Sequence, residues 1–206
     1  MKRLSSLVVF LFLVINFIVL TDAEAGYFTT KLGLVQPEEY NETNFGTTKW
    51  EFDDGTNFSI AFGGNIEMFR LEGEISYRKM DFESRTSIPA GTTQNFGGDQ
   101  KQLQFMFNCI WQIMPEWPVS PFLGLGIGET LIYWNDVNTV IDDADYVFTY
   151  QGILGVSIRV SDNFFIEGTY YYVKSGDIEM EDDSGDTGKL DNQEQNIIAV
   201  GIRVNF

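Results

Sequence analysis

Histidine is absent from this chain of 206 residues, and cysteine occurs once, as Cys109. Histidine is the usual general base near neutral pH, so its absence argues against acyl-transfer and proteolytic chemistry. A single cysteine excludes an intramolecular disulfide framework. Glu72 and Glu74 are paired carboxylates, but their spacing places them beside Arg70 and Arg78, which indicates a structural charge network. The sequence therefore predicts a protein that is not an enzyme, with no catalytic residue and no cofactor.

Positive charge is also scarce. The chain has 13 lysines and arginines against 30 aspartates and glutamates, which gives a formal net charge of -17. Proteins bind nucleic acids largely by neutralising phosphates with Lys and Arg, so this balance argues against a nucleic-acid partner. It also argues against simple adsorption to an anionic membrane surface.

No apolar run reaches the about 20 residues that a membrane-spanning helix needs. The nearest, Leu7–Leu20, follows two basic residues and precedes a small-x-small cleavage pattern that ends at Ala25. This arrangement is typical of a secretory signal peptide rather than of a membrane anchor. We therefore expect a signal peptide over residues 1–25, cleaved near Ala25, and one domain over residues 26–206.

Alternating apolar residues are abundant. The last nine residues place Ile198, Val200, Ile202, Val204 and Phe206 at every second position, with small or polar residues between them. This period is that of a β-strand with one apolar face. Eight is the smallest strand number that closes a transmembrane barrel. Eight such runs are predicted, at about 26–35, 56–65, 69–81, 101–113, 119–134, 146–160, 164–174 and 194–206.

The two faces of these runs indicate their surroundings. In the third run Leu71, Ile75 and Tyr77 share one face, while Arg70 and Glu72 belong to the other. Apolar side chains outside and charged ones inside are the pattern of a membrane barrel. A soluble barrel would hide its apolar face instead. The predicted fold is all-β, an eight-stranded antiparallel up-and-down transmembrane β-barrel preceded by the cleaved signal peptide.

The connections alternate in length, as a membrane barrel requires. An even strand number then leaves both ends of the domain in the periplasm. The short connections, predicted to be periplasmic, are residues 65–68, 112–118 and 161–163. The long connections, predicted to be extracellular, lie near 36–55, 82–100, 135–145 and 175–193.

Three segments carry a resemblance to a known family. Phe148–Val173 resembles the penultimate hairpin of the OmpA-like and opacity-type outer-membrane barrels, and Phe69–Arg78 and Ser120–Gly128 fit the same family. The resemblance covers the whole predicted domain. It implies an eight-stranded barrel in the outer membrane of a Gram-negative bacterium. It implies no catalytic residues, because the family has no shared active site.

The resemblance also implies partners during and after assembly. The barrel-assembly machinery is expected to recognise the terminal strand, with Ile202, Val204 and Phe206 as the assembly signal. Periplasmic chaperones are expected to accompany the chain, and outer-membrane lipid and lipopolysaccharide to surround it.

Charged side chains are predicted to fill the lumen. An interior of eight strands is just wide enough for side chains, and buried charges must be paired. We therefore expect a plugged lumen and no general diffusion channel. Gly124, Gly126 and Gly128, on the inner face of the fifth run, would leave room for long side chains or allow strand curvature. The predicted lumen network consists of Lys31, Arg70, Glu72, Glu74, Arg78, Arg159, Glu167 and Arg203.

The long connections are acidic, and the last is the most acidic. Asp182, Asp183 and Asp186 form an oxygen-rich cluster of the kind that binds Ca²⁺, but their spacing does not match an EF-hand loop. No metal site is therefore predicted, and a solvated acidic loop is the default interpretation. A divalent cation or a surface partner, if one binds, is expected at these loops.

The sequence predicts a structural or surface-interaction role. Two alternatives stay open: a carrier or channel for small apolar molecules across the outer membrane, and an adhesin or host-interaction surface antigen. A charge-filled lumen would favour the structural role, and an apolar extracellular funnel the carrier. An adhesin would need a partner for the first and fourth long connections.

Overall fold

The computed structural model describes part of the chain, and the statements below concern that part. Two predictions lie outside it: the signal peptide of residues 1–25, and the acidic cluster of Asp182, Asp183 and Asp186. The described residues are 26–37, 40–42, 48–52, 54–87, 92–94, 98–136, 144–176, 178–181, 187–190 and 193–206.

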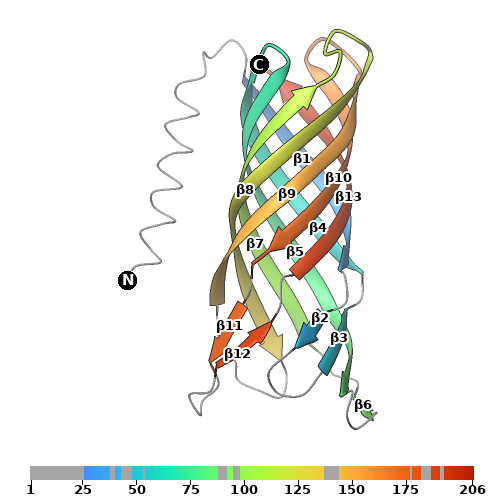
Figure 1. Ribbon diagram of the computed structural model, residues 1–206. Coiled ribbons are helices and arrows are strands. Elements are labelled where there is room, and N and C mark those ends of the chain that lie inside the picture. Colours follow the sequence, from blue (N-terminus) through green and yellow to red (C-terminus); the bar gives the residue numbers. More distant parts are fainter. Residues whose placement is uncertain are drawn as a thin grey trace.

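Eight strands of the described chain form a closed antiparallel barrel (Figure 1). Each barrel strand is hydrogen-bonded to the next one along the chain, and β1 pairs with β13 to close the cylinder. The predicted eight-stranded fold is confirmed. The barrel strands are β1 (Gly26–Pro37), β4 (Gly55–Ile66), β5 (Phe69–Ser87), β7 (Gly98–Gln112), β8 (Val119–Asp136), β9 (Ala144–Arg159), β10 (Phe164–Ser175) and β13 (Gln193–Asn205).

The pairing register gives the tilt of the strands. A row of paired residues that starts at Phe69 on β5 passes once around the barrel and returns to β5 at Lys79, ten residues further on. With about 3.3 Å per residue and about 4.8 Å between strands, this shift corresponds to a tilt of about 40°. Lys79 therefore lies about 25 Å above Phe69 along the barrel axis, which is the height of the apolar band of outer-membrane barrels.

Burial alternates residue by residue along the barrel strands. On β10, Phe165, Glu167 and Thr169 are buried, whereas Phe164 and Ile166 are exposed. The same alternation places apolar side chains outside on the other barrel strands, whereas the interior holds most of the polar and charged side chains together with a cluster of apolar ones that includes Val35, Met80 and Ile197. The two faces assigned from the sequence are thus the faces of the structure.

Five short strands lie beyond one end of the barrel (Figure 1). The outer part of β5 pairs with two of them, and the pairing continues from β3 through β2 and β12 to β11. These strands lie in the first, second and fourth long connections. They are β2 (Tyr40–Glu42), β3 (Thr48–Phe52), β6 (Thr92–Gln94), β11 (Ile178–Glu181) and β12 (Thr187–Leu190).

The opposite end of the barrel has the short turns and the end of the chain (Figure 1). Glu67 and Met114 adopt positive φ angles of 54° and 60° in two of these turns. The amide of Phe206 donates to the carbonyl of Gly26 at 2.9 Å, which ties the last residue to the first barrel strand. Helices long and apolar enough to cross a membrane are not found among the described residues.

Candidate functional sites in the lumen and at the outer end

Glu167 on β10 is the centre of an ion network inside the barrel. The network lies in the half nearer the short turns, which Figure 1 draws at the top and which is called the lower lumen here because it is the predicted periplasmic half. Its Oε1 accepts hydrogen bonds from Arg70 Nη1 at 2.5 Å and from Arg203 Nε at 2.9 Å. Its Oε2 lies 3.9 Å from Lys31 Nζ. The four side chains are at most 2% exposed. Three cations thus share one carboxylate, and loss of that carboxylate would leave buried charge uncompensated.

Glu72 on β5 extends the network toward β1 and β7. Tyr27 donates its hydroxyl to Glu72 Oε2 at 2.8 Å, and Asn108 Nδ2 donates to Glu72 Oε1 at 3.1 Å. Both carboxylate oxygens therefore have a partner, as a buried carboxylate requires.

Glu74, two residues further along β5, connects the network to β10. Its Oε2 accepts hydrogen bonds from Asn108 Nδ2 at 3.2 Å and from the Tyr171 hydroxyl at 3.3 Å. The Tyr171 hydroxyl in turn accepts a hydrogen bond from Lys31 Nζ at 2.8 Å. A continuous polar path therefore links the Glu74 carboxylate to the cations around Glu167.

Aromatic rings cover the faces of the lower guanidinium groups. The Arg203 guanidinium lies 3.9 Å from the centroid of the Phe165 ring. That of Arg70 lies 4.9 Å from the Phe122 centroid and 5.4 Å from the Tyr27 centroid. Such stacking stabilises a cation whose N–H groups are not all hydrogen-bonded, and Arg70 Nε and Nη2 have no hydrogen-bond partner.

Glycines on one strand make room for contacts between side chains of the two strands on either side of it. Gly201 on β13 pairs with Lys31 on one side and with Glu167 on the other. A Cβ at Gly201 would lie 2.4 Å from Lys31 Cγ, so only glycine leaves space for the two side chains to approach. Two further glycines have the same position, Gly63 between Tyr27 and Glu72 and Gly126 between Asn108 and Gln151.

The glycine run on β8 faces a filled lumen. A Cβ at Gly126 would lie 2.1 Å from Asn108 Oδ1, and one at Gly124 would lie 2.9 Å from Ile110 Cγ1. At Gly128 the nearest atom would be the Phe105 carbonyl oxygen, at 1.9 Å. The space that these three glycines leave on the inner face of β8 is thus occupied by atoms of the neighbouring strands.

Arg78 and a set of amides fill the upper lumen. Arg78 donates to Asn57 Oδ1 and to Gln195 Oε1, both at 3.1 Å, and also to Gln104 Oε1. Gln102 Nε2 donates to Gln193 Oε1 at 3.2 Å. These amides are at most 4% exposed. The upper lumen therefore carries less charge than the lower lumen, and its amides lie beside buried apolar side chains that include Val35 and Met80.

Seven of the eight predicted network residues are buried in the lumen. Arg78 belongs to the upper amide cluster, not to the Glu167 network. The seven and their exposed fractions are Lys31 2%, Arg70 0%, Glu72 1%, Glu74 3%, Arg78 2%, Glu167 0% and Arg203 2%.

The prediction for Arg159 was wrong. Arg159 ends β9 at the periplasmic mouth, where its side chain is exposed. It donates to the Pro115 carbonyl at 2.8 Å, and its guanidinium lies 5.8 Å from the Phe165 centroid. Its place in the alternation is inward, but it is the last residue of its strand. Alternation predicts the face of a residue and not its depth.

The uncharged members of the network were missed. Tyr27, Asn108 and Tyr171 are at most 2% exposed and bridge the charged groups. Their place in the alternation could have predicted that they lie in the lumen. Tyr171, for example, follows Glu167 by four residues and is therefore on the same face of β10.

Two further expectations concern metal ligands and the assembly signal. No group of three or more metal-ligating side chains occurs within the described part of the chain. Ile202 and Phe206 are exposed on the outward face of β13, at 46% and 65%, and Val204 is half-buried. Recognition of these three residues by the assembly machinery stays a prediction.

Comparisons with known proteins agree with this architecture. Residues 25–197 match a protein family described as surface antigen. Curated proteins give no match to the chain. At the identities given below, likeness to a solved structure shows the fold alone.

Three solved structures illustrate the likeness. Neisserial surface protein A (NspA) has a TM-score of 0.60 and 16% identity, over 88% of this chain and 97% of that chain. The outer membrane protein OprG from Pseudomonas aeruginosa has a TM-score of 0.64 and 14% identity, over 90% and 98%. The outer membrane protein AlkL, studied in DMPC bilayers, has a TM-score of 0.55 and 10% identity, over 90% and 92%.

Proposed function

This chain belongs to the surface antigen family and lies in the bacterial outer membrane, and we propose that it acts there as a non-enzymatic, plugged barrel whose acidic outer sheet contacts partners at the cell surface. The proposal includes a narrower kinship with the OmpA-like and opacity-type barrels, which the segments Phe148–Val173 and Phe69–Arg78 support.

The pairing between the first and fourth long connections carries the proposal. Leu190 on β12 pairs with Glu42 on β2, so strands from both connections belong to one sheet that continues from β5. Segments 36–55 and 175–193 together have 13 acidic residues and two lysines. Two separate acidic loops would each be solvated alone, whereas strands paired in one sheet bring the two acidic segments together. An acidic surface attracts basic partners and repels anionic ones.

The filled lumen supports a role at the surface rather than transport. The interior of eight strands is just wide enough for side chains, and the charged lumen residues are ion-paired or hydrogen-bonded and almost fully buried. Opening a path would require breaking several buried ion pairs, each costly to separate. The absence of histidine supports a non-enzymatic role.

The test compares vesicles that contain the wild type with vesicles that contain a variant in which residues 177–191 are replaced by a neutral Gly-Ser segment. Immobilised synthetic peptides of equal length, one set basic and one set acidic, are the probes. We expect the basic set to retain wild-type vesicles and to lose them as ionic strength rises. Retention of the variant should be lower. Equal retention of wild type and variant on both peptide sets would contradict the proposed surface role.

The carrier alternative is checked with intact cells that contain or lack the protein. Uptake of a small apolar fluorescent probe should proceed at the same rate in both. Faster uptake in cells that contain the protein would favour the carrier over the proposed role.

A further inference from the structure

One strand of the outer sheet has a neighbour on one side only. The outer sheet continues from β5 through β3, β2 and β12, and it ends at β11. Each residue of β11 pairs with β12, from Ile178 with Leu190 to Glu181 with Thr187. Within the described part of the chain, β11 pairs with no other strand. The second side of β11 is therefore an open sheet edge.

This edge begins where the chain leaves the barrel wall. The amide of Gly176 donates to the carbonyl of Phe148 at 2.8 Å, next to the last pair between β10 and β9. β11 then pairs with β12 in the same register in which β10 pairs with β13, so β11 continues β10 outward. The open side of β11 is the side on which β10 pairs with β9. β11 contacts β9 and runs on past the end of that strand, so the edge extends beyond the wall (Figure 1).

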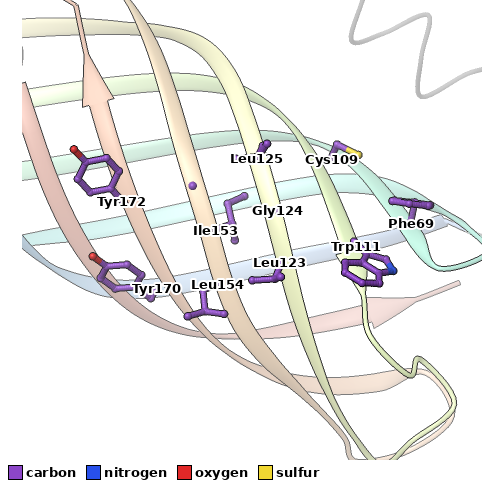
Figure 2. A pocket seen from close by; sticks show the side chains of 11 residues that line it. Phe69, Cys109, Trp111, Leu123, Gly124, Leu125, Ile153, Leu154, Tyr170 and Tyr172 are labelled. Atoms are coloured by element: carbon purple, nitrogen blue, oxygen red, sulfur yellow. The ribbon is translucent and has the colours of Figure 1, made fainter.

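The wall below this edge is covered by lipid. Large apolar side chains lie on the outward face between β7 and β10 (Figure 2), among them Leu123, Leu125 and Leu154, which are 43%, 73% and 52% exposed. In the outer membrane such a face is in contact with hydrocarbon. A water-soluble partner at the cell surface can therefore reach only the outer end of the protein.

The open side of a strand presents backbone donors and acceptors. In an antiparallel sheet every second residue directs both its N–H and its C=O to the same side, so the four residues of β11 include two of this kind. An extended peptide can bind such groups as an added strand. β6 also has one neighbour among the described strands, but it is one residue shorter and carries no charge. β11 is therefore the better edge for a partner.

The charge of β11 selects the partner. β11 contains Glu179 and Glu181 and no basic residue, and Asp177, Asp182 and Asp183 flank it in the sequence. A second copy of this chain would place the same acidic strand opposite, and like charges on paired strands destabilise a sheet. A basic segment would instead gain backbone hydrogen bonds together with charge complementarity.

We propose that the open edge of β11 binds an extended segment of a partner protein, rich in lysine or arginine, which adds to the outer sheet as one further strand. This inference rests on the proposed surface role and gives it a binding mode. The surface role requires only that the sheet attracts positive charge. Strand addition also requires backbone N–H groups in the partner, and this difference makes the two separable.

Two peptides with the same side chains test the binding mode. One is a short peptide of alternating lysine and threonine, and the other is the same peptide methylated at every backbone nitrogen, which keeps the charge but has no N–H to donate. Binding to wild-type protein in neutral phosphatidylcholine vesicles is measured by fluorescence anisotropy. We expect the methylated peptide to bind about tenfold more weakly, because its hydrogen bonds to the edge are lost. A ¹³C-carbonyl label in the bound unmethylated peptide should give the infrared frequency of a β-strand.

Two double variants test the location. Glu179→Gln with Glu181→Gln removes two charges from β11, whereas Glu42→Gln with Glu51→Gln removes two from β2 and β3. β2 and β3 are two and three strands away from β11, about 10 and 15 Å, which is a Debye length or more. We expect the affinity for the unmethylated peptide to fall about fivefold in the first variant and less than about twofold in the second.

The possible results distinguish failure of this inference from failure of the surface role. Equal affinity for the two peptides would overturn strand addition and leave the surface role intact. Equal losses in the two double variants would overturn β11 as the site. If the wild type does not bind the unmethylated peptide, both proposals are wrong. A dimer that forms without peptide, and that the unmethylated peptide dissociates, would overturn the choice of partner in favour of a second copy of the chain.

Discussion

Arg70 and Glu167 are 97 residues apart in the sequence, and their side chains meet at 2.5 Å across the lumen. The two residues lie on β5 and β10, which are not neighbours in the barrel. Both side chains are 1% exposed. The contact therefore spans the interior and connects opposite sides of the wall, which hydrogen bonds between adjacent strands do not do.

Removal of the Glu167 charge should destabilise the barrel strongly. Glu167→Gln leaves three buried cations without their shared carboxylate, and we expect a loss of about 3–5 kcal/mol in the free energy of unfolding. Urea unfolding in lipid vesicles, followed by tryptophan fluorescence, measures it. Lys101→Gln is the control, because Lys101 and Asp99 form a pair whose side chains are 40% and 19% exposed. Its loss should be about 1 kcal/mol or less. Equal losses in the two variants would contradict a dominant role for the lumen network.

A methyl group at Gly201 should be costly. Gly201→Ala places its Cβ 2.3 Å from the Thr30 carbonyl oxygen and 2.4 Å from Lys31 Cγ, so the wall and the ion network must both shift. We expect a loss of about 1–3 kcal/mol in the free energy of unfolding. Gly168→Ala, at an outward position with no atom within 4 Å, is the control and should be neutral or slightly stabilising. The idea that lumen contacts require glycine fails if both variants unfold at the same urea concentration.

Phe206→Ala should reduce assembly. The Phe206 ring covers Gly26, since a Cβ there would lie 2.8 Å from Phe206 Cε2, and the terminal strand is the predicted signal for the assembly machinery. The fraction of protein in outer membranes that changes gel mobility on boiling should fall. Phe164→Ala, which removes an aromatic that is 49% exposed at the start of β10, serves as the control. If both variants assemble as well as the wild type, the terminal aromatic is not a signal.

Reconstituted wild-type protein should give no steady large conductance. Paired charges with aromatic rings fill the lower lumen, and amides with apolar side chains fill the upper lumen, so no continuous water path is expected. Single-channel recording in planar bilayers tests this, with bilayers that lack protein as the control. Large, regular conductance steps would show that the lumen opens.

Alternation was sufficient to predict the barrel, because each side chain of a strand has only two environments. β10 was expected at 164–174 and spans Phe164–Ser175. Arg159 shows the limit of this approach, because its face was right and its depth was wrong. Depth depends on where the barrel wall ends, and that is set by strand tilt and pairing register.

The pairing that joins the strands of the outer sheet was beyond the reach of the sequence patterns. β5 was expected to end near residue 81 but continues to Ser87, because β3 and β6 pair with its outer part. The contact of Leu190 with Glu42 joins segments that are distant in the chain, and neither segment shows a clear period of two. Local periodicity does not carry information on such pairing.

The position of Glu167 beside the seam has a consequence for the order of events during assembly. Two of its partners, Lys31 and Arg203, come from β1 and β13, the first and last barrel strands, whose pairing closes the cylinder. Until those strands pair, Lys31 stays apart from Glu167 and Arg203, which lie on the neighbouring strands β10 and β13. Closure of the seam is what brings Lys31 to Glu167. Reopening the β1–β13 seam would separate Lys31 from Glu167 again. The closed barrel should therefore unfold slowly, even if each strand alone is unstable.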